Sequence, residues 1–141
     1  MKQCILVASA SEARILTRND LGPVKEKERL EHPENRLHAG DLEEQGGGAQ
    51  HESNKTDMRQ TDPRTETAEK YAERFADRVA QRLRELRNDH AMDELLIAAE
   101  PRFLGHLRQK LDSATEGRIS RTVDKDYTSA SVDTIHKKLL M

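Results

Sequence analysis

The chain has 141 residues, which is enough for one domain and short for two, so we expect a single domain over residues 1–141. Charged residues make up 35% of it, against the ~25% usual in globular domains, and 24 basic and 26 acidic side chains give a formal charge of −2. This balance argues against a protein that coats nucleic acid but leaves room for a local basic face, and no apolar run approaches the roughly 18 residues of a membrane span.

The first apolar stretch, residues 4–8, is shorter than the ~7–15 residues of a signal-peptide core. It is apolar on both faces, which is typical of a central strand covered on each side. Cys4 is the only cysteine, so no internal disulfide can form, and a mid-strand position predicts a buried, inert thiol. We therefore expect a cytoplasmic protein.

Two more strands are predicted at residues 13–17 and 24–30, with turn residues at 19–23 between them. The segment 24–30 contains good helix formers, but its position directly after a turn favours a strand. Its lysines suit the protected edge of a meander, because charged side chains discourage pairing with other chains.

Residues 39–62 contain few apolar side chains and include the glycines 46–48. Such a stretch cannot bury enough surface to offset its ordering entropy, so we predict a flexible loop there. A loop of this length within a compact domain is more often functional or disordered than structural.

A long helix is predicted from Pro63, with Asp62 as its N-cap, to about Asn88, because apolar residues recur there at steps of three and four. An apolar strand at 94–99 follows, and then a helix that begins at Pro101.

The last two predicted elements are a strand at 118–124 and a helix over about 131–140. In that strand Ile119, Arg121 and Val123 alternate with Ser120 and Thr122, which predicts two opposite faces.

The predicted order of elements is β-β-β-α-β-α-β-α. Strands joined by tight turns are antiparallel, whereas strands that follow crossover helices run parallel to a neighbour. The apolar strands at 4–8 and 94–99 should be central neighbours, with the charged third strand and the fifth at the edges. This is an α/β fold with the ribonuclease H-like mixed sheet, in the strand order 3-2-1-4-5.

A nuclease of this fold needs clustered carboxylates for divalent metal ions, one of them on the central first strand. That strand has none, and the nearest candidates are Glu12, Asp124 and Asp126. Acids at a strand end more often form turns or helix caps, so we do not expect a nuclease. The six histidines lack ligand spacing, and we expect no metal and no cofactor.

A line of basic residues at steps of four along the long helix could contact phosphates. The line consists of Lys70, Arg74, Arg78 and Arg82. The alternative is an ordinary solvated face, on which Lys70 pairs with Glu73 and Arg74 pairs with Asp77. No interleaved aromatic residue is evident in the sequence, which favours the solvated face.

Five segments resemble the bacterial host attachment protein family, named for a proposed requirement in attachment to host cells. They are Ala13-Arg14-Ile15-Leu16, His32-Pro33-Glu34-Asn35-Arg36-Leu37, Thr61-Asp62-Pro63, Ala99-Glu100-Pro101-Arg102-Phe103-Leu104-Gly105 and Val123-Asp124-Lys125-Asp126-Tyr127-Thr128. The resemblance marks as family motif the residues Pro101, Arg102, Phe103, Gly105, Asp124, Lys125 and Asp126.

That family is in turn similar to the middle domain of archaeal and eukaryotic peptide-chain release factors, in which a Gly-Gly-Gln loop positions water for ester hydrolysis. The resemblance assigns this catalytic role to Gly47, Gly48 and Gln50. Here Ala49 separates the glycine from the glutamine, and a backbone-dependent geometry should not survive that insertion unchanged.

Three functions remain open from the sequence. The first is a cytosolic, non-catalytic module that binds the ribosome or RNA such as tRNA, with any role in attachment being indirect. The second is a release-factor-like peptidyl-tRNA hydrolase that uses the Gly/Gln loop. The third is an exported attachment factor. We favour the first and expect neither a membrane nor a DNA partner, while the oligomeric state stays open.

Overall fold

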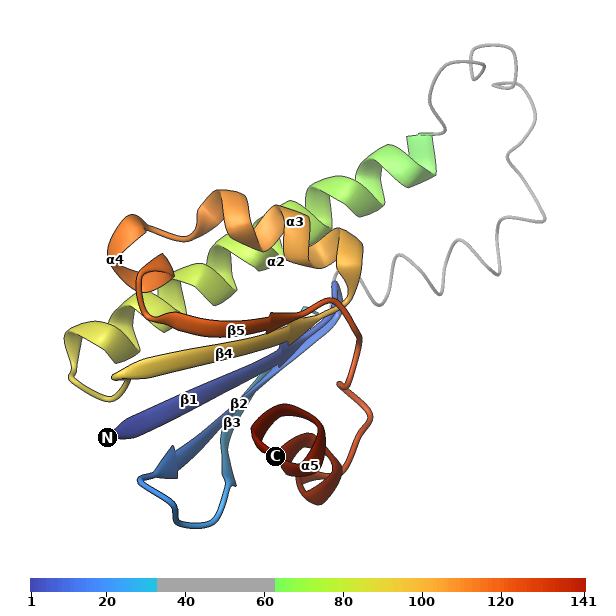
Figure 1. The fold of residues 1–141 in the computed structure, drawn as a ribbon. Helices are drawn as coiled ribbons and strands as arrows, with labels where there is room; N and C mark the ends of the chain where they lie inside the picture. Colours follow the sequence, from blue (N-terminus) through green and yellow to red (C-terminus); the bar gives the residue numbers. More distant parts are fainter. Residues whose placement is uncertain (33–62) are drawn as a thin grey trace.

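The computed structural model describes residues 1–32 and 63–141, with side chains of the first helix described from residue 67. These residues form three layers, in which one sheet has α2 and α3 on one face and α5 on the other (Figure 1). The five strands are ordered β3-β2-β1-β4-β5. The pairs β1–β2 and β2–β3 are antiparallel, whereas the pairs β1–β4 and β4–β5 are parallel. The expected ribonuclease H-like sheet is therefore confirmed.

The strands match their predicted positions to within two residues at each end. Their bounds are β1 (Lys2–Ala8), β2 (Glu12–Asn19), β3 (Lys25–Glu31), β4 (Glu94–Ala99) and β5 (Ile119–Val123). The two most apolar strands, β1 and β4, are paired at the centre, with Cys4 opposite Leu95 and Ala8 opposite Ala99. Both are covered on each face, which is why neither shows polar alternation.

The helices include one that the sequence pattern did not predict. Their bounds are α2 (Pro63–Asn88), α3 (Pro101–Lys110), α4 (Ser113–Glu116) and α5 (Val132–Leu140). The unpredicted α4 is a single turn, too short to show a hydrophobic period, and is held by its N-cap Asp112. Among the described helices, none has the length and apolarity to cross a bilayer. The predicted loop at 39–62 lies outside the described residues.

Two apolar cores lie on opposite faces of the sheet. The α2/α3-side core contains Phe75, Leu83, Phe103 and Leu107 together with one face of the central strands. The smaller α5-side core contains Ile135 and Leu139 with the other face. Alternate residues of β1 enter the two cores, so each position of this strand is enclosed.

Two β-bulges change which side chains share a face. The β2–β3 register shifts so that Ile15 lies opposite Glu28 and Leu16 lies opposite Glu26. The β4–β5 register shifts in the same way at Ser120. A bulge inserts one extra residue and reverses the alternation beyond it. The predicted shared face of Ile119, Arg121 and Val123 is therefore wrong, since Ile119 packs on the α2/α3 side and Val123 on the α5 side.

Candidate functional site

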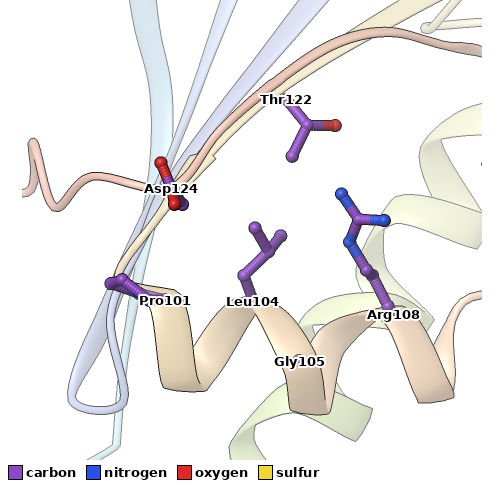
Figure 2. A pocket seen from close by; sticks show the side chains of 6 residues that line it. All are labelled: Pro101, Leu104, Gly105, Arg108, Thr122 and Asp124. Carbon is purple, nitrogen blue, oxygen red and sulfur yellow. The ribbon is translucent and has the colours of Figure 1, made fainter.

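Two segments far apart in the sequence meet at one side of the molecule and form a surface pocket of about 360 Å³. One segment is the exposed side of α3, and the other is the end of β5 (Figure 2). The pocket is lined by Pro101, Leu104, Gly105, Arg108, Thr122 and Asp124. The motif positions Pro101, Gly105 and Asp124 thus come together in space.

The start of α3 fixes the position of the pocket relative to the sheet. The carboxylate of Glu100 accepts hydrogen bonds from the backbone N–H groups of Arg102 (3.1 Å) and Phe103 (2.9 Å), which caps the helix directly after β4. The Phe103 side chain is buried in the α2/α3-side core, whereas Arg102 is exposed outside the pocket. Of these two motif residues, Phe103 therefore has a packing role.

The bulge at Ser120 determines the other wall of the pocket. Beyond it, Thr122 lies opposite Ile97, whose side chain belongs to the α2/α3-side core. Thr122 and the following Asp124 consequently line the pocket against α3. Without the extra residue, alternation from Ile119 would direct Thr122 to the α5 side.

Gly105 lies inside α3, where a glycine normally costs about 0.5–1 kcal/mol relative to alanine. A Cβ atom at this position would meet no atom within 4 Å, and no described glycine has a positive φ. Gly105→Ala is therefore expected to raise the free energy of unfolding by about 0.5–1 kcal/mol, measured by urea denaturation. Gly22→Ala is the control and should destabilise, because its Cβ would lie 3.1 Å from the Asn19 carbonyl oxygen. A loss of stability in Gly105→Ala would contradict this reading.

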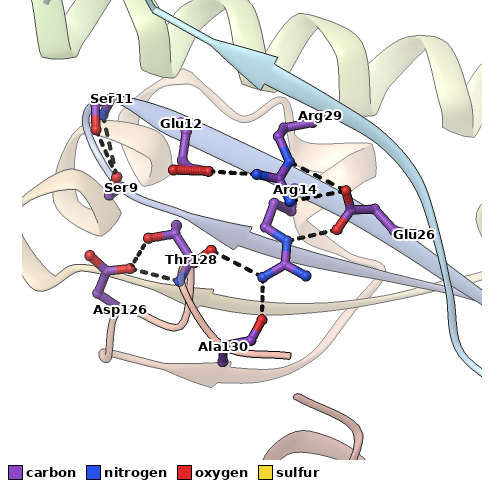
Figure 3. Close-up of polar contacts among 9 residues, drawn as sticks. All are labelled: Ser9, Ser11, Glu12, Arg14, Glu26, Arg29, Asp126, Thr128 and Ala130. Carbon is purple, nitrogen blue, oxygen red and sulfur yellow. Dashed lines mark hydrogen bonds and ion pairs between the residues drawn. The ribbon is translucent and has the colours of Figure 1, made fainter. Parts of the chain in front are cut away.

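The segment after β5 is held by a turn at Asp126. Its carboxylate accepts hydrogen bonds from the backbone N–H (2.8 Å) and the hydroxyl (2.5 Å) of Thr128 (Figure 3). This is the local capping that short acidic side chains favour. Asp126 thus acts as a turn former, as its strand-end position predicted, and Lys125 beside it is exposed.

Arg14 on β2 ties the same segment to the sheet. Its side chain is 5% exposed, and Nη1 donates to the carbonyl oxygens of Thr128 (3.0 Å) and Ala130 (2.5 Å). Nε donates to Glu26 at 2.7 Å (Figure 3). Burial opposes ionisation of Glu26, but the hydrogen bond and charge of Arg14, helped by Arg29, hold the pKa of Glu26 below its ordinary value of 4.5.

The three acids considered for a nuclease lie in different settings. Glu12 accepts a hydrogen bond from Arg29, Asp126 forms its turn, and Asp124 lines the pocket. Within residues 1–32 and 63–141, no group of three histidine, cysteine or acidic side chains is placed to hold a metal ion.

The predicted basic line of α2 divides into two parts. Arg82 is engaged by Glu28 of β3 (2.8 Å) and by Glu85 (3.0 Å). These hydrogen bonds raise the pKa of Arg82, and the bond from Arg82 holds the pKa of Glu28 below its ordinary value. Arg78 donates to the carbonyl oxygen of Glu31 at 2.9 Å.

Lys70 and Arg74 are exposed, and no ion pair to them occurs within the described part of the chain. The predicted pairs Lys70–Glu73 and Arg74–Asp77 are therefore not formed. Arg82 instead reaches across to the sheet, because the β3 bulge directs Glu28 toward α2.

An aromatic group adjoins this basic line, contrary to the expectation from sequence. The Arg74 guanidinium lies 5.6 Å from the centre of the half-buried Tyr71 ring, within the range of a cation–π contact. Tyr71 meets His32 edge-on at 5.8 Å, and His32 stacks on Phe75 at 5.2 Å. His32 directly follows β3, and the spacing of residues along α2 cannot show which residues of another element contact this helix.

Cys4 is fully buried in the α2/α3-side core. Burial raises its pKa to about 12, with a smaller contribution from the charge of Glu28. The prediction of a buried, inert thiol is confirmed, since a thiol with that pKa supplies almost no thiolate at neutral pH.

The residues to which the resemblance assigned catalysis lie outside the described part of the chain; they are Gly47, Gly48 and Gln50. Conversely, the sequence analysis gave no site role to Arg108 or Thr122, and none to Arg14, although Arg14 lies in one of the segments that resemble the family. Arg108 could have been found, because it follows Gly105 by three residues and so lies on the same face of α3. Arg14 carries no such signal, since a charged residue within an apolar strand does not indicate its partners.

A family model described as "Protein required for attachment to host cells" matches residues 4–139. Both the pocket and the basic line of α2 lie within this match. No curated protein matches the chain.

Proposed function

The chain belongs to the family of proteins required for attachment to host cells, and from this premise we propose that it is a non-catalytic module that binds RNA or the ribosome inside the cell. Any effect on attachment is then indirect, through translation or its regulation. The observation that carries the proposal is the exposed group Lys70, Arg74 and Arg78 beside the Tyr71 ring. We call this group the α2 basic face.

The α2 basic face has the features of a phosphate-tracking surface. Lys70 and Arg78 are separated by about 12 Å along the helix, at 1.5 Å per residue, which is long enough for more than one phosphate of a single strand. Arg74 lies over the half-buried Tyr71 ring, and arginine and aromatic side chains are the groups on which bases of a single strand stack. Glu73 and Asp77 are exposed on the same helix, so we expect moderate, salt-sensitive affinity.

A non-catalytic role agrees with the state of Cys4, the single cysteine of the chain. Cys4 is enclosed and keeps its proton at neutral pH. Ala49 interrupts the Gly/Gln tripeptide on which the hydrolase alternative depends. The proposal therefore assigns binding rather than ester hydrolysis to the chain.

Co-sedimentation of the purified chain with ribosomes tests this proposal. Three phosphate contacts to a single strand predict a salt slope of about −2, or roughly 15- to 20-fold weaker binding at 200 mM than at 50 mM salt. Arg74→Glu/Arg78→Glu is expected to weaken binding by at least about tenfold, because two contacts become repulsive.

Lys137→Glu/Lys138→Glu is the matched control. It makes the same change in net charge at exposed positions of α5, on the opposite face of the sheet, and should bind nearly as wild type does. The proposal would be overturned if the fraction of the chain that co-sediments with ribosomes did not change with salt, or if it fell equally in both variants. Loss of the bound material after ribonuclease treatment would identify RNA as the component recognised.

A further inference from the structure

The pocket between α3 and β5 is separate from the α2 basic face and has the features of a small-ligand site. Its volume of about 360 Å³ lies within the ~300–1,000 Å³ range of ligand pockets. Figure 2 shows the Leu104 side chain at its centre, with Asp124 beside Pro101 at one end and Arg108 at the other. The pocket therefore combines an apolar floor with opposite charges at its two ends.

The charged groups at the two ends of the pocket belong to Arg108 and Asp124. Neither Arg108 nor Asp124 forms an ion pair with any residue that the structure describes. A ligand that carries an anion at one end and a cation at the other would complement both groups at once. A purely anionic or purely cationic ligand would meet repulsion at one end.

Gly105 leaves the helix surface bare between these two ends. Its missing side chain relieves no crowding within the described residues, because a Cβ atom there would have no neighbour within 4 Å. The space is instead continuous with the pocket that Gly105 lines. A glycine in a helix interior is unfavourable, and its lack of a side chain here leaves room for another molecule to approach the helix closely.

The outer edge of β5 supplies a third recognition element. β5 pairs with β4 on one side only, and no other described strand covers its second side. An extended peptide can therefore add to this edge by backbone hydrogen bonds while the pocket receives one of its side chains. The opposite edge strand, β3, is densely charged and is less suited to such pairing.

From these features we infer that the pocket binds a short peptide with free termini, extended antiparallel to β5. The peptide's carboxylate pairs with Arg108, its ammonium group pairs with Asp124, and an apolar side chain covers Leu104. The direction of the peptide follows from the fold. Asp124 lies at the carboxyl end of β5, and α3 runs from there toward the amino end of the strands, where Arg108 lies. A peptide with its ammonium group at Asp124 and its carboxylate at Arg108 therefore runs antiparallel to β5.

The length of the peptide follows from the helix. Pro101 and Arg108 are separated by about 10 Å along α3 at 1.5 Å per residue. An extended chain covers about 3.3–3.6 Å per residue, so a tripeptide matches this span. A free amino acid, with a single residue, covers only about a third of this length.

Titration of the full-length, ¹⁵N-labelled chain with the tripeptide Ala-Leu-Ala tests the inference. Saturable shifts of the Gly105 and Thr122 amide signals are expected, with a dissociation constant of about 1 mM or below. Arg108→Gln and Gly105→Ala should each weaken binding about tenfold or more, the first by removing a charge-assisted hydrogen bond and the second by filling the space. Arg102→Gln is the matched control on α3 and should bind as wild type does.

Blocked peptides test the assignment of each end. N-acetylation of Ala-Leu-Ala should weaken binding to wild type but not to Asp124→Asn, because that variant no longer distinguishes the two forms. Amidation of the carboxyl terminus should likewise weaken binding to wild type but not to Arg108→Gln. The absence of saturable shifts, or binding that persists unchanged in both Arg108→Gln and Gly105→Ala, would overturn the inference. Neither result bears on ribosome binding, since these variants leave the α2 basic face intact.

Discussion

Phe103→Ala is expected to lower the free energy of unfolding by about 3–5 kcal/mol, measured by urea denaturation followed by circular dichroism. The ring is 1% exposed and lies 5.7 Å, centre to centre, from that of Phe75 in the α2/α3-side core. Truncation removes both the apolar contact and the aromatic pair, and it leaves a cavity below the first turn of α3.

The adjacent residue provides the control for this change. Arg102 is exposed, and only its backbone N–H takes part in the cap at Glu100. Arg102→Ala should therefore change the free energy of unfolding by no more than about 0.5 kcal/mol. If Arg102→Ala and Phe103→Ala lowered the free energy of unfolding equally, the assignment of Phe103 to the core and of Arg102 to the surface would be contradicted.

Arg14→Met is expected to lower the free energy of unfolding by about 3 kcal/mol, because it removes one member of a largely buried network. Methionine keeps the apolar stem but cannot donate to the carbonyl oxygens of Thr128 and Ala130, and it leaves Glu26 without its shortest hydrogen bond. Thermal and urea denaturation measure the loss. Amide exchange should accelerate in the segment around Thr128, which Arg14 ties to β2.

Arg29→Met is the matched control for Arg14→Met. It removes the same charge and also frees Glu26 of a partner, but Arg29 is exposed and its ion pairs are longer, at 3.2 and 3.4 Å. We expect a loss below about 1 kcal/mol. Similar losses in the two variants would contradict the special role assigned to the buried guanidinium.

The pH dependence of stability gives a second readout of Arg14. Because the pKa of Glu26 is lower in the folded chain than its ordinary value of 4.5, its charge stabilises the fold above pH 4.5. That contribution is lost as the pH falls through the lowered pKa. Arg14→Met removes the main interaction that lowers the pKa of Glu26. The difference in the free energy of unfolding between this variant and wild type should therefore become smaller at acidic pH.

The order of the strands was predictable because it depends on composition along short segments. Continuous apolar runs in β1 and β4 require cover on both faces, which only central positions provide. The charged β3 fits an edge for the opposite reason. The bounds of α2 were equally predictable from the sequence, because Pro63 marks the first helical position and an apolar stripe follows it.

The partners of charged side chains were not predictable. The two pairs that sequence spacing suggested within α2 are not formed. Arg82 binds Glu28 of β3 in addition to Glu85 of α2, and Arg87 binds Asp112 beside α4. A helix position specifies which residues neighbour it on the same helix, but not what a long side chain meets on another element. The single turn α4 was missed for a related reason, because four residues show no period.

The α/β class, the neighbouring central strands, the long helix and the burial of Cys4 could be predicted from the residues alone, because each depends on the polarity of consecutive residues. The faces of the edge strands could not. Bulges at Lys27 and Ser120 separate Glu26 from Glu28 and bring Thr122 against α3. The physical reason is that a bulge is a property of two paired strands. One extra residue reverses every side chain beyond it, and no single segment records where its partner makes that insertion.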